Sequence, residues 1–96
     1  MNKLLYQFIE TAKSEPKSEE LLLIKLMEEI GEVSEAYLSS KHPAMNKDKN
    51  LTLEDYQEEL VDTLLVTATL LFKSEISRED FEDLCKRKIS KWQSKQ

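Results

Sequence analysis

Apolar residues recur at helical spacing in four stretches of this 96-residue chain, and polar segments separate those stretches. The first runs from roughly Asn2 to Lys13, with its apolar residues on one side of a helix. Pro16 fits the first turn of a helix but not its interior. A second helix is therefore expected to begin near Pro16 and to run to about Ser40. The pattern predicts an all-α protein.

A polar segment and two capping signals place the remaining two helices. His42-Pro43 and the run 46–50 predict the longest loop. Thr52 is a good N-cap residue with an acidic residue at the capping-box position, so a third helix is expected from there to about Lys73. Ser77 has the same relation to Asp80 and caps a fourth helix that ends near Trp92.

The third predicted helix is apolar around nearly its whole circumference. At about 100° per residue, one apolar set covers more than half of the circle and a second set lies on the remaining side. The two sets are Leu60, Val61, Leu64, Leu65, Ala68, Leu71 and Phe72, and then Val66 and Leu70. Such a helix must be buried on nearly all sides. Three neighbours are too few to cover it, so we expect a four-helix bundle-type subunit in a homo-oligomer, either a homodimer or a tetramer.

Composition removes several classes of function. A single glycine cannot supply a phosphate-binding P-loop or a GxGxxG motif. The net charge of −5 argues against binding a nucleic-acid polymer, and the chain has no apolar run long enough to span a membrane. One cysteine cannot form an intrachain disulfide, which suits a cytoplasmic location. The length is that of a single domain, residues 1–96.

Acidic side chains lie on the apolar stripes of the second and third helices. Glu29 shares its stripe with four apolar residues, and Glu32 lies beside it. On the third helix, Glu59 and Asp62 form an i, i+3 pair on a stripe that two apolar residues continue. The apolar neighbours are Leu22, Leu26, Val33 and Ala36 on the second helix, and Val66 and Leu70 on the third.

The ordinary interpretation of acidic residues on helices is a solvated face, which suits Glu28 and Glu58. It suits two acidic pairs on apolar stripes poorly, because a buried carboxylate without a partner is costly. Lys25 and Lys73 are the only cations within the two helical cores. A divalent cation is therefore the more economical counter-charge. A site of oxygen ligands alone favours Mg²⁺ or Mn²⁺ and is typical of polyphosphate binding.

Two motifs carry a family resemblance. Residues 28–32 have the form EExxE, residues 59–62 have the form ExxD, and 26 residues separate them. Over about residues 20–73 the chain resembles the MazG-like all-α nucleoside triphosphate pyrophosphohydrolases. The resemblance implies a helical bundle of two or more subunits. It also implies Mg²⁺-dependent hydrolysis of a (d)NTP at the α–β phosphate bond, giving the monophosphate and pyrophosphate in nucleotide-pool housecleaning.

By motif position, the resemblance implies that the metal ligands are Glu29, Glu32, Glu59 and Asp62. Glu28, the first acid of EExxE, would complete a second metal site or orient the attacking water. Gly31 either leaves room for another helix to approach or is merely tolerated.

The substrate-binding candidates lie further along the chain. From Leu84 onward there are five basic residues and no acidic side chain. Cations also suit the C-terminal end of a helix without any ligand. The expected phosphate or base contacts are Lys73, Lys88, Lys91 and Trp92.

Two alternatives on the same scaffold remain open, a phosphoribosyl-ATP pyrophosphohydrolase and a dUTPase-like enzyme. The residues after ExxD favour the MazG-like group over both. A third alternative is a non-catalytic helical interaction module, whose acids would be solvated or paired. It predicts no stabilisation by Mg²⁺, whereas a metal that binds the folded state must raise the melting temperature.

Overall fold

The structure is a computed structural model that describes residues 2–42, 44 and 50–96. These residues form four helices and no strand, which confirms the all-α prediction: α1 Lys3–Ser14, α2 Glu19–Lys41, α3 Leu53–Lys73 and α4 Arg78–Lys95. The first three helices end within one residue of the expected positions, and α4 continues three residues past Trp92. Most of the expected loop, Pro43 and 46–49, lies outside the described residues.

Each helix begins at a side-chain cap. The side chains of Asn2, Ser18, Thr52 and Ser77 each accept a hydrogen bond from the backbone N–H three residues later. At α3 the capping box is complete, because Asp55 accepts from the Thr52 backbone N–H at 2.8 Å. The hydrogen bonds from Thr52, its backbone N–H first, lower the pKa of Asp55. The starts of α3 and α4 are therefore determined locally, as the capping signals predicted.

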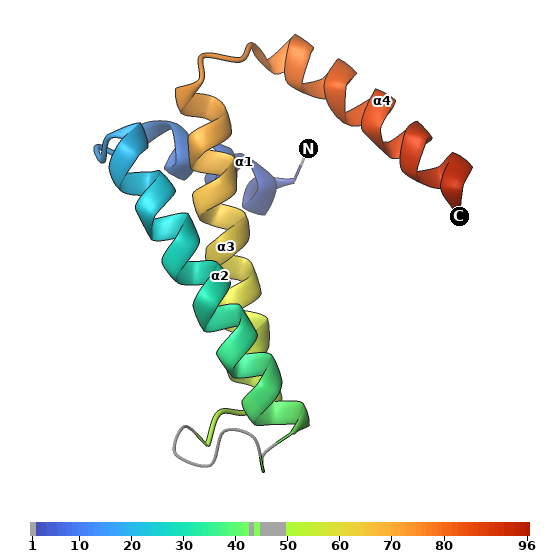
Figure 1. Ribbon diagram of the computed structural model, residues 1–96. Coiled ribbons are helices and arrows are strands. Elements are labelled where there is room, and N and C mark those ends of the chain that lie inside the picture. Colours follow the sequence, from blue (N-terminus) through green and yellow to red (C-terminus); the bar gives the residue numbers. More distant parts are fainter. Residues whose placement is uncertain (1, 43, 45–49) are drawn as a thin grey trace.

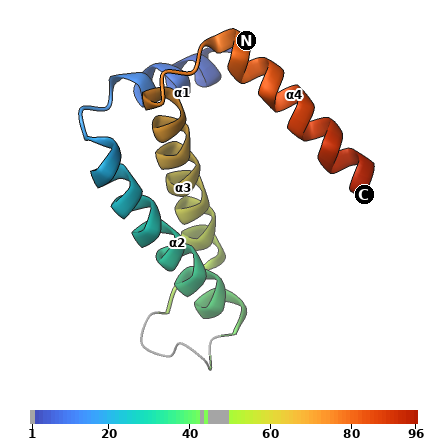
Figure 2. The same cartoon turned by 45° about the horizontal axis from the view of Figure 1, so that its top comes forward.

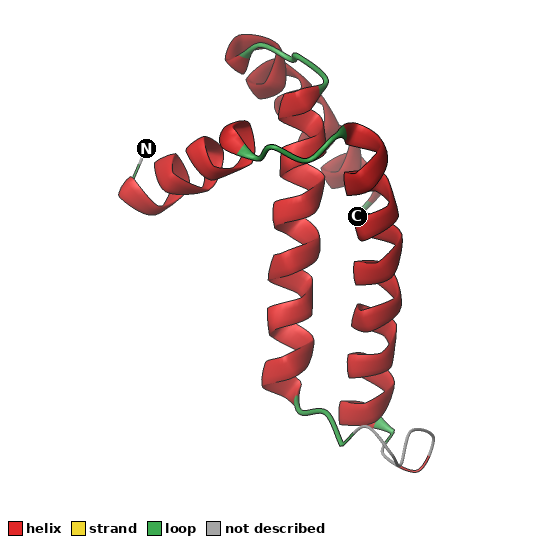
Figure 3. Cartoon of the chain, turned by 90° about the vertical axis from the view of Figure 1, so that its left-hand side faces the viewer, coloured by secondary structure: helices red, strands yellow, loops and turns green. Residues whose placement is uncertain are grey.

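Helices α2 and α3 run antiparallel and lie side by side (Figures 1 and 3), and together they are called the α2–α3 hairpin below. The buried residues of α2 include Leu22, Glu29 and Ala36, which are seven residues apart and lie on one stripe. Val66 and Thr69 are the buried residues of α3. The expected stripe through Glu29 is thus the face that α2 buries.

The loop end of the α2–α3 hairpin is held by two contacts. The rings of Tyr37 and Tyr56 meet edge to face with their centroids 5.5 Å apart. The buried Ser39 hydroxyl accepts a hydrogen bond from the Leu51 backbone N–H at 2.7 Å. Together they fix where the chain returns from α2 to α3.

The first and last helices attach at the other end of the hairpin. Helix α1 packs against α3 and buries Ala12. Helix α4 contacts α3 through two aromatic rings. The centroid of the Phe81 ring, in the first turn of α4, lies 5.5 Å from that of Phe72 on α3. Beyond this first turn α4 runs away from the hairpin, and within the described residues no other helix packs along it (Figure 2).

A single chain leaves a large surface uncovered. Its accessible area is 7650 Å², whereas a compact monomer of this mass exposes about 5,700 Å². Its radius of gyration is 16.0 Å, compared with about 13 Å for a compact domain of this length. Several large apolar side chains are exposed on α3, the helix expected to be buried all round: Leu60, Val61 and Leu64. None of the helices in the described ranges is long and apolar enough to cross a membrane.

Candidate functional site

Three carboxylates meet across the α2–α3 hairpin. Glu29 comes from α2, and Glu59 and Asp62 come from adjacent turns of α3. One oxygen from each lies within 4.8 Å of the others, and we call these three residues the acid cluster. Residues three apart on a helix point to the same side, so the ExxD spacing places both α3 carboxylates toward α2. The structure thus brings together three of the four predicted ligands.

Within the described part of the chain, two oxygens of the acid cluster are buried without a hydrogen-bond partner. Glu29 is only 5% exposed, and its Oε2 atom has no hydrogen bond. The Oε2 atom of Glu59 is also buried and also accepts no hydrogen bond. Burying a polar atom without a hydrogen bond costs about 1–3 kcal/mol, and more for a charged group. The hairpin therefore places unsatisfied oxygen acceptors at its centre.

Burial, together with the nearby acids, makes Glu59 hard to ionise. Burial, followed by the neighbouring carboxylates of Glu32 and Glu29, raises the pKa of Glu59 to about 7. Lys25 supplies a positive charge, since its Nζ donates to Glu29 Oε1 at 3.2 Å. This hydrogen bond is the main reason that the pKa of Lys25 is raised. One lysine does not balance the cluster, because the pKa of Glu59 is still raised.

The acid cluster fits a divalent metal ion. Its ligand atoms are all carboxylate oxygens, which suit Mg²⁺ or Mn²⁺ better than zinc or copper. The two orphaned oxygens, Glu29 Oε2 and Glu59 Oε2, come from different helices of the hairpin. A cation between the helices would satisfy both atoms and remove the electrostatic reason for protonating Glu59.

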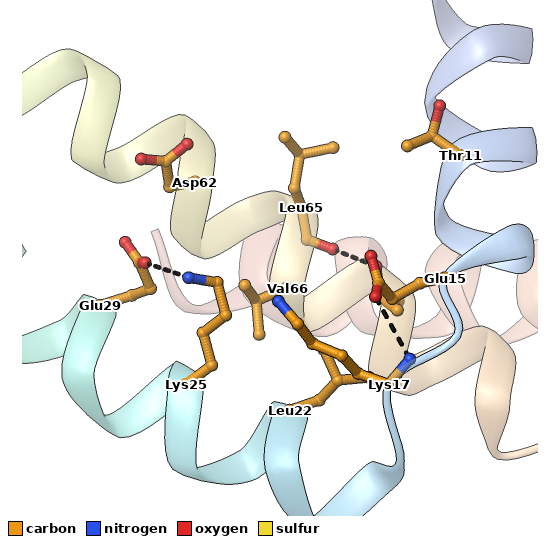
Figure 4. A pocket seen from close by; sticks show the side chains of 10 residues that line it. Thr11, Glu15, Lys17, Leu22, Lys25, Glu29, Asp62, Leu65 and Val66 are labelled. Carbon is orange, nitrogen blue, oxygen red and sulfur yellow. Dashed lines mark hydrogen bonds and ion pairs between the residues drawn. The ribbon is translucent and has the colours of Figure 1, made fainter.

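A pocket of about 260 Å³ adjoins the cluster (Figure 4). Glu29 and Asp62 line one part of it, together with Lys25. Its remaining lining comes from the end of α1, the α1–α2 linker, α2 and α3: Thr11, Glu15, Lys17, Leu22, Leu65, Val66 and Thr69. The pocket is therefore built from three helices and combines acidic, basic and hydroxyl groups.

The other predicted site residues lie outside this pocket. Glu32 is exposed, but it is near enough to raise the pKa of Glu59. Glu28 is exposed on α2. Lys73 follows Asp62 by eleven residues on α3, which places it about 16 Å further along the helix.

The candidates on α4 are also separated from the acid cluster within one chain. Lys88 and Trp92 line a surface hollow formed by α4 alone, and Lys91 is exposed on the same helix. Trp92 is 69% exposed. Their assignment to the substrate stays a prediction.

Lys17 and Thr11 were not among the residues expected at the site. Lys25 was noted only as a cation on the second helix, although its i, i+4 relation to Glu29 is visible in the sequence. No sequence pattern points to Lys17 or Thr11, because their position depends on how α1 folds back against α3.

The model of the phosphoribosyl-ATP pyrophosphohydrolase family matches residues 3–88 of the chain. No curated protein and no solved structure matches it.

Proposed function

Since this chain belongs to the phosphoribosyl-ATP pyrophosphohydrolase family, we propose that it is a Mg²⁺-dependent enzyme that hydrolyses a nucleoside triphosphate at the α–β phosphate bond. Membership confirms the all-α pyrophosphohydrolase superfamily that the EExxE and ExxD motifs predicted. This family is one of the alternatives to the MazG-like group that the sequence leaves open. That the chain belongs to the MazG-like group itself is therefore part of the proposal. The products would be the nucleoside monophosphate and pyrophosphate.

The observation that carries the proposal is the pair of orphaned oxygens in the acid cluster. Glu29 and Glu59 would hold the metal through them, with Asp62 and the neighbouring Glu32 completing the set. When bound, Mg²⁺ supplies Lewis-acid polarisation of the phosphate oxygens. An acidic chain of net charge −5 needs such a counter-charge before it can attract a polyphosphate.

The chain's own residues supply the remaining chemistry. Among the residues that the structure describes, no serine, cysteine or histidine lines the pocket beside the acids, so direct attack by water is the simpler route. Glu28 is on the solvent side of α2 next to Glu29, where it would orient that water or complete a second metal site.

We propose that the active form is a homo-oligomer, either a dimer or a tetramer. The surface in excess of a compact monomer is about 2,000 Å² per chain, which is the scale of an obligate interface. In such an assembly α4, which runs away from the α2–α3 hairpin of its own chain (Figure 2), would carry Lys88, Lys91 and Trp92 toward the substrate of a neighbouring subunit. Lys73, at the end of α3, would be a further phosphate contact. The single cysteine suits a cytoplasmic enzyme.

The family match also supports a second candidate substrate, phosphoribosyl-ATP. The family match names phosphoribosyl-ATP, which also carries a triphosphate whose α–β bond would be cleaved. The acid cluster acts on the phosphates and does not distinguish the two substrates. The choice between them depends on contacts to the base and sugar.

Pyrophosphate release from all canonical NTPs and dNTPs and from phosphoribosyl-ATP tests the proposal, with Mg²⁺ and with EDTA. Glu59→Ala and Asp62→Ala should abolish turnover while helicity is kept, and Glu58→Ala, exposed on the same helix, is the matched control. If phosphoribosyl-ATP alone were hydrolysed, it would replace the nucleoside triphosphates as the proposed substrate. Full activity in both variants, or silence across the panel together with no effect of Mg²⁺ on melting, would favour the interaction module.

A further inference from the structure

The pocket beside the acid cluster contains two lysines that the proposed metal site does not use. Lys25 lies one turn before Glu29 on α2, and Lys17 lies in the linker between α1 and α2. Both line the same 260 Å³ pocket as Glu29 and Asp62 (Figure 4). Two ammonium groups and two candidate metal ligands therefore share one hollow.

The groups in this pocket are held in place by contacts of their own. Glu29 is buried and directs one unpartnered oxygen into the hairpin, while its other oxygen accepts from Lys25 Nζ at 3.2 Å. The Lys25 side chain is 41% exposed, so solvent or a ligand reaches it from the pocket side. Glu15 accepts a hydrogen bond from the Lys17 backbone N–H at 3.2 Å, which shapes the linker that carries Lys17.

The charges of the side chains that line the pocket explain why a metal ion has to bind before a phosphate chain does. Two lysines face three carboxylates, those of Glu15, Glu29 and Asp62, so the lining has a net charge of −1. The carboxylate of Glu59 lies next to this lining in the acid cluster, so the site as a whole is acidic. A bound divalent cation would offset two of these negative charges, and a phosphate chain would then be repelled less than in the absence of metal.

We propose that Lys17 and Lys25 bind the phosphate chain of the substrate next to the metal, an inference that rests on the proposed function. A lysine ammonium binds phosphate oxygens as a point charge. Lys25 is now the counter-charge of Glu29. Once a cation takes over that carboxylate, the Lys25 ammonium is free to bind a phosphate oxygen within the same pocket.

The size of the pocket limits what occupies it. Pockets that enclose drug-sized ligands have about 300–1,000 Å³. A space of about 260 Å³ suits a phosphate chain and leaves the base and sugar outside. This pocket therefore selects for a polyphosphate and is indifferent to the base.

The test is binding of inorganic pyrophosphate to the full chain by calorimetry, at saturating Mg²⁺ and pH 8. Lys17→Gln and Lys25→Gln should each weaken pyrophosphate binding about tenfold, the usual effect of losing one charged hydrogen bond. Lys25→Arg keeps the charge and should retain most of the affinity. Lys41→Gln, at the exposed end of the same helix, is the matched control and should bind like the unmodified protein.

Three outcomes would overturn the inference. The first is no pyrophosphate binding by the unmodified protein with Mg²⁺, and the second is unchanged affinity in both glutamine variants. The third concerns a lysine that merely neutralises Glu29: Lys25→Gln would then bind Mg²⁺ more tightly, while pyrophosphate affinity at saturating Mg²⁺ stayed the same. Lysine-dependent pyrophosphate binding in a protein that cleaves no nucleotide would support this inference and refute the proposed function.

Discussion

Ionised Glu59 should destabilise the metal-free protein at alkaline pH. Burial, reinforced by Glu32 and Glu29, raises its pKa from 4.5 to about 7 in the folded state. Above pH 7 the carboxyl is ionised in both states, so the folded state bears the full cost of the charge. Below about pH 4.5 it is protonated in both states and the cost disappears. The stability of the metal-free protein should therefore fall as the pH rises from 4.5 to 7.

The magnitude follows from the pKa change. Each unit corresponds to about 1.4 kcal/mol, so the shift sets a ceiling of about 3 kcal/mol on the destabilisation. Solvent reaches part of the Glu59 side chain, which lowers the expected effect to the order of 2 kcal/mol. Glu59→Gln keeps the shape and removes the charge. In a domain of this size it should raise the melting temperature at pH 8 by about 10 °C.

Thermal melting followed by circular dichroism in EDTA, from pH 5 to pH 8, checks this expectation. The gap between Glu59→Gln and the unmodified protein should be widest at pH 8 and should largely close at pH 5. Glu58→Gln, the exposed neighbour on α3, removes the same charge outside the acid cluster and should show no such pH dependence. A gap that is constant with pH, or a less stable Glu59→Gln at pH 8, would refute the reasoning.

Three further predictions concern the metal, the lone glycine and the assembly. Mg²⁺ should raise the melting temperature more at pH 8 than at pH 6, because it competes with the proton on Glu59, and Glu29→Gln should remove most of this effect. Gly31→Ala should stabilise the chain by up to about 1 kcal/mol in thermal melting, since a Cβ there meets nothing within 4 Å; a loss of stability would reveal a partner helix. Sedimentation should give a multiple of 11.2 kDa, and a monomer at micromolar concentration would contradict the proposed assembly.

The helices could be predicted because their signals are local. Thr52 and Ser77 each cap the helix that begins at the next residue, and such a cap depends on residues within one turn. Apolar spacing likewise identified the stripe through Glu29 as a buried face. Periodicity assigns a residue to a side of its helix, and the α2–α3 hairpin then brings two such sides together.

The rest of the site depends on information that periodicity does not contain. Lys17 reaches the pocket because α1 folds back against α3. The sequence does not indicate the angle between these two helices. The basic residues of α4 could be recognised as a cluster, but their spacing does not tell where the helix points. Helix α4 leaves the hairpin after the contact between Phe81 and Phe72, so Lys88 and Lys91 lie away from the acid cluster of their own chain.

The energetics of the acid cluster bear on whether the chain is an enzyme or an interaction module. Domains are stable by only about 5–15 kcal/mol, so a cost of the order of 2 kcal/mol at Glu59 alone is a substantial fraction. A structural role gains nothing from that cost, because apolar residues in place of buried charges are often neutral or stabilising. At neutral pH, a cation between Glu29 and Glu59 would remove this cost. The α2–α3 hairpin is the best-packed part of the structure, and the described residues bury few apolar side chains. Acids that destabilise this hairpin without a metal therefore favour a metal-dependent enzyme over a module held together by packing alone.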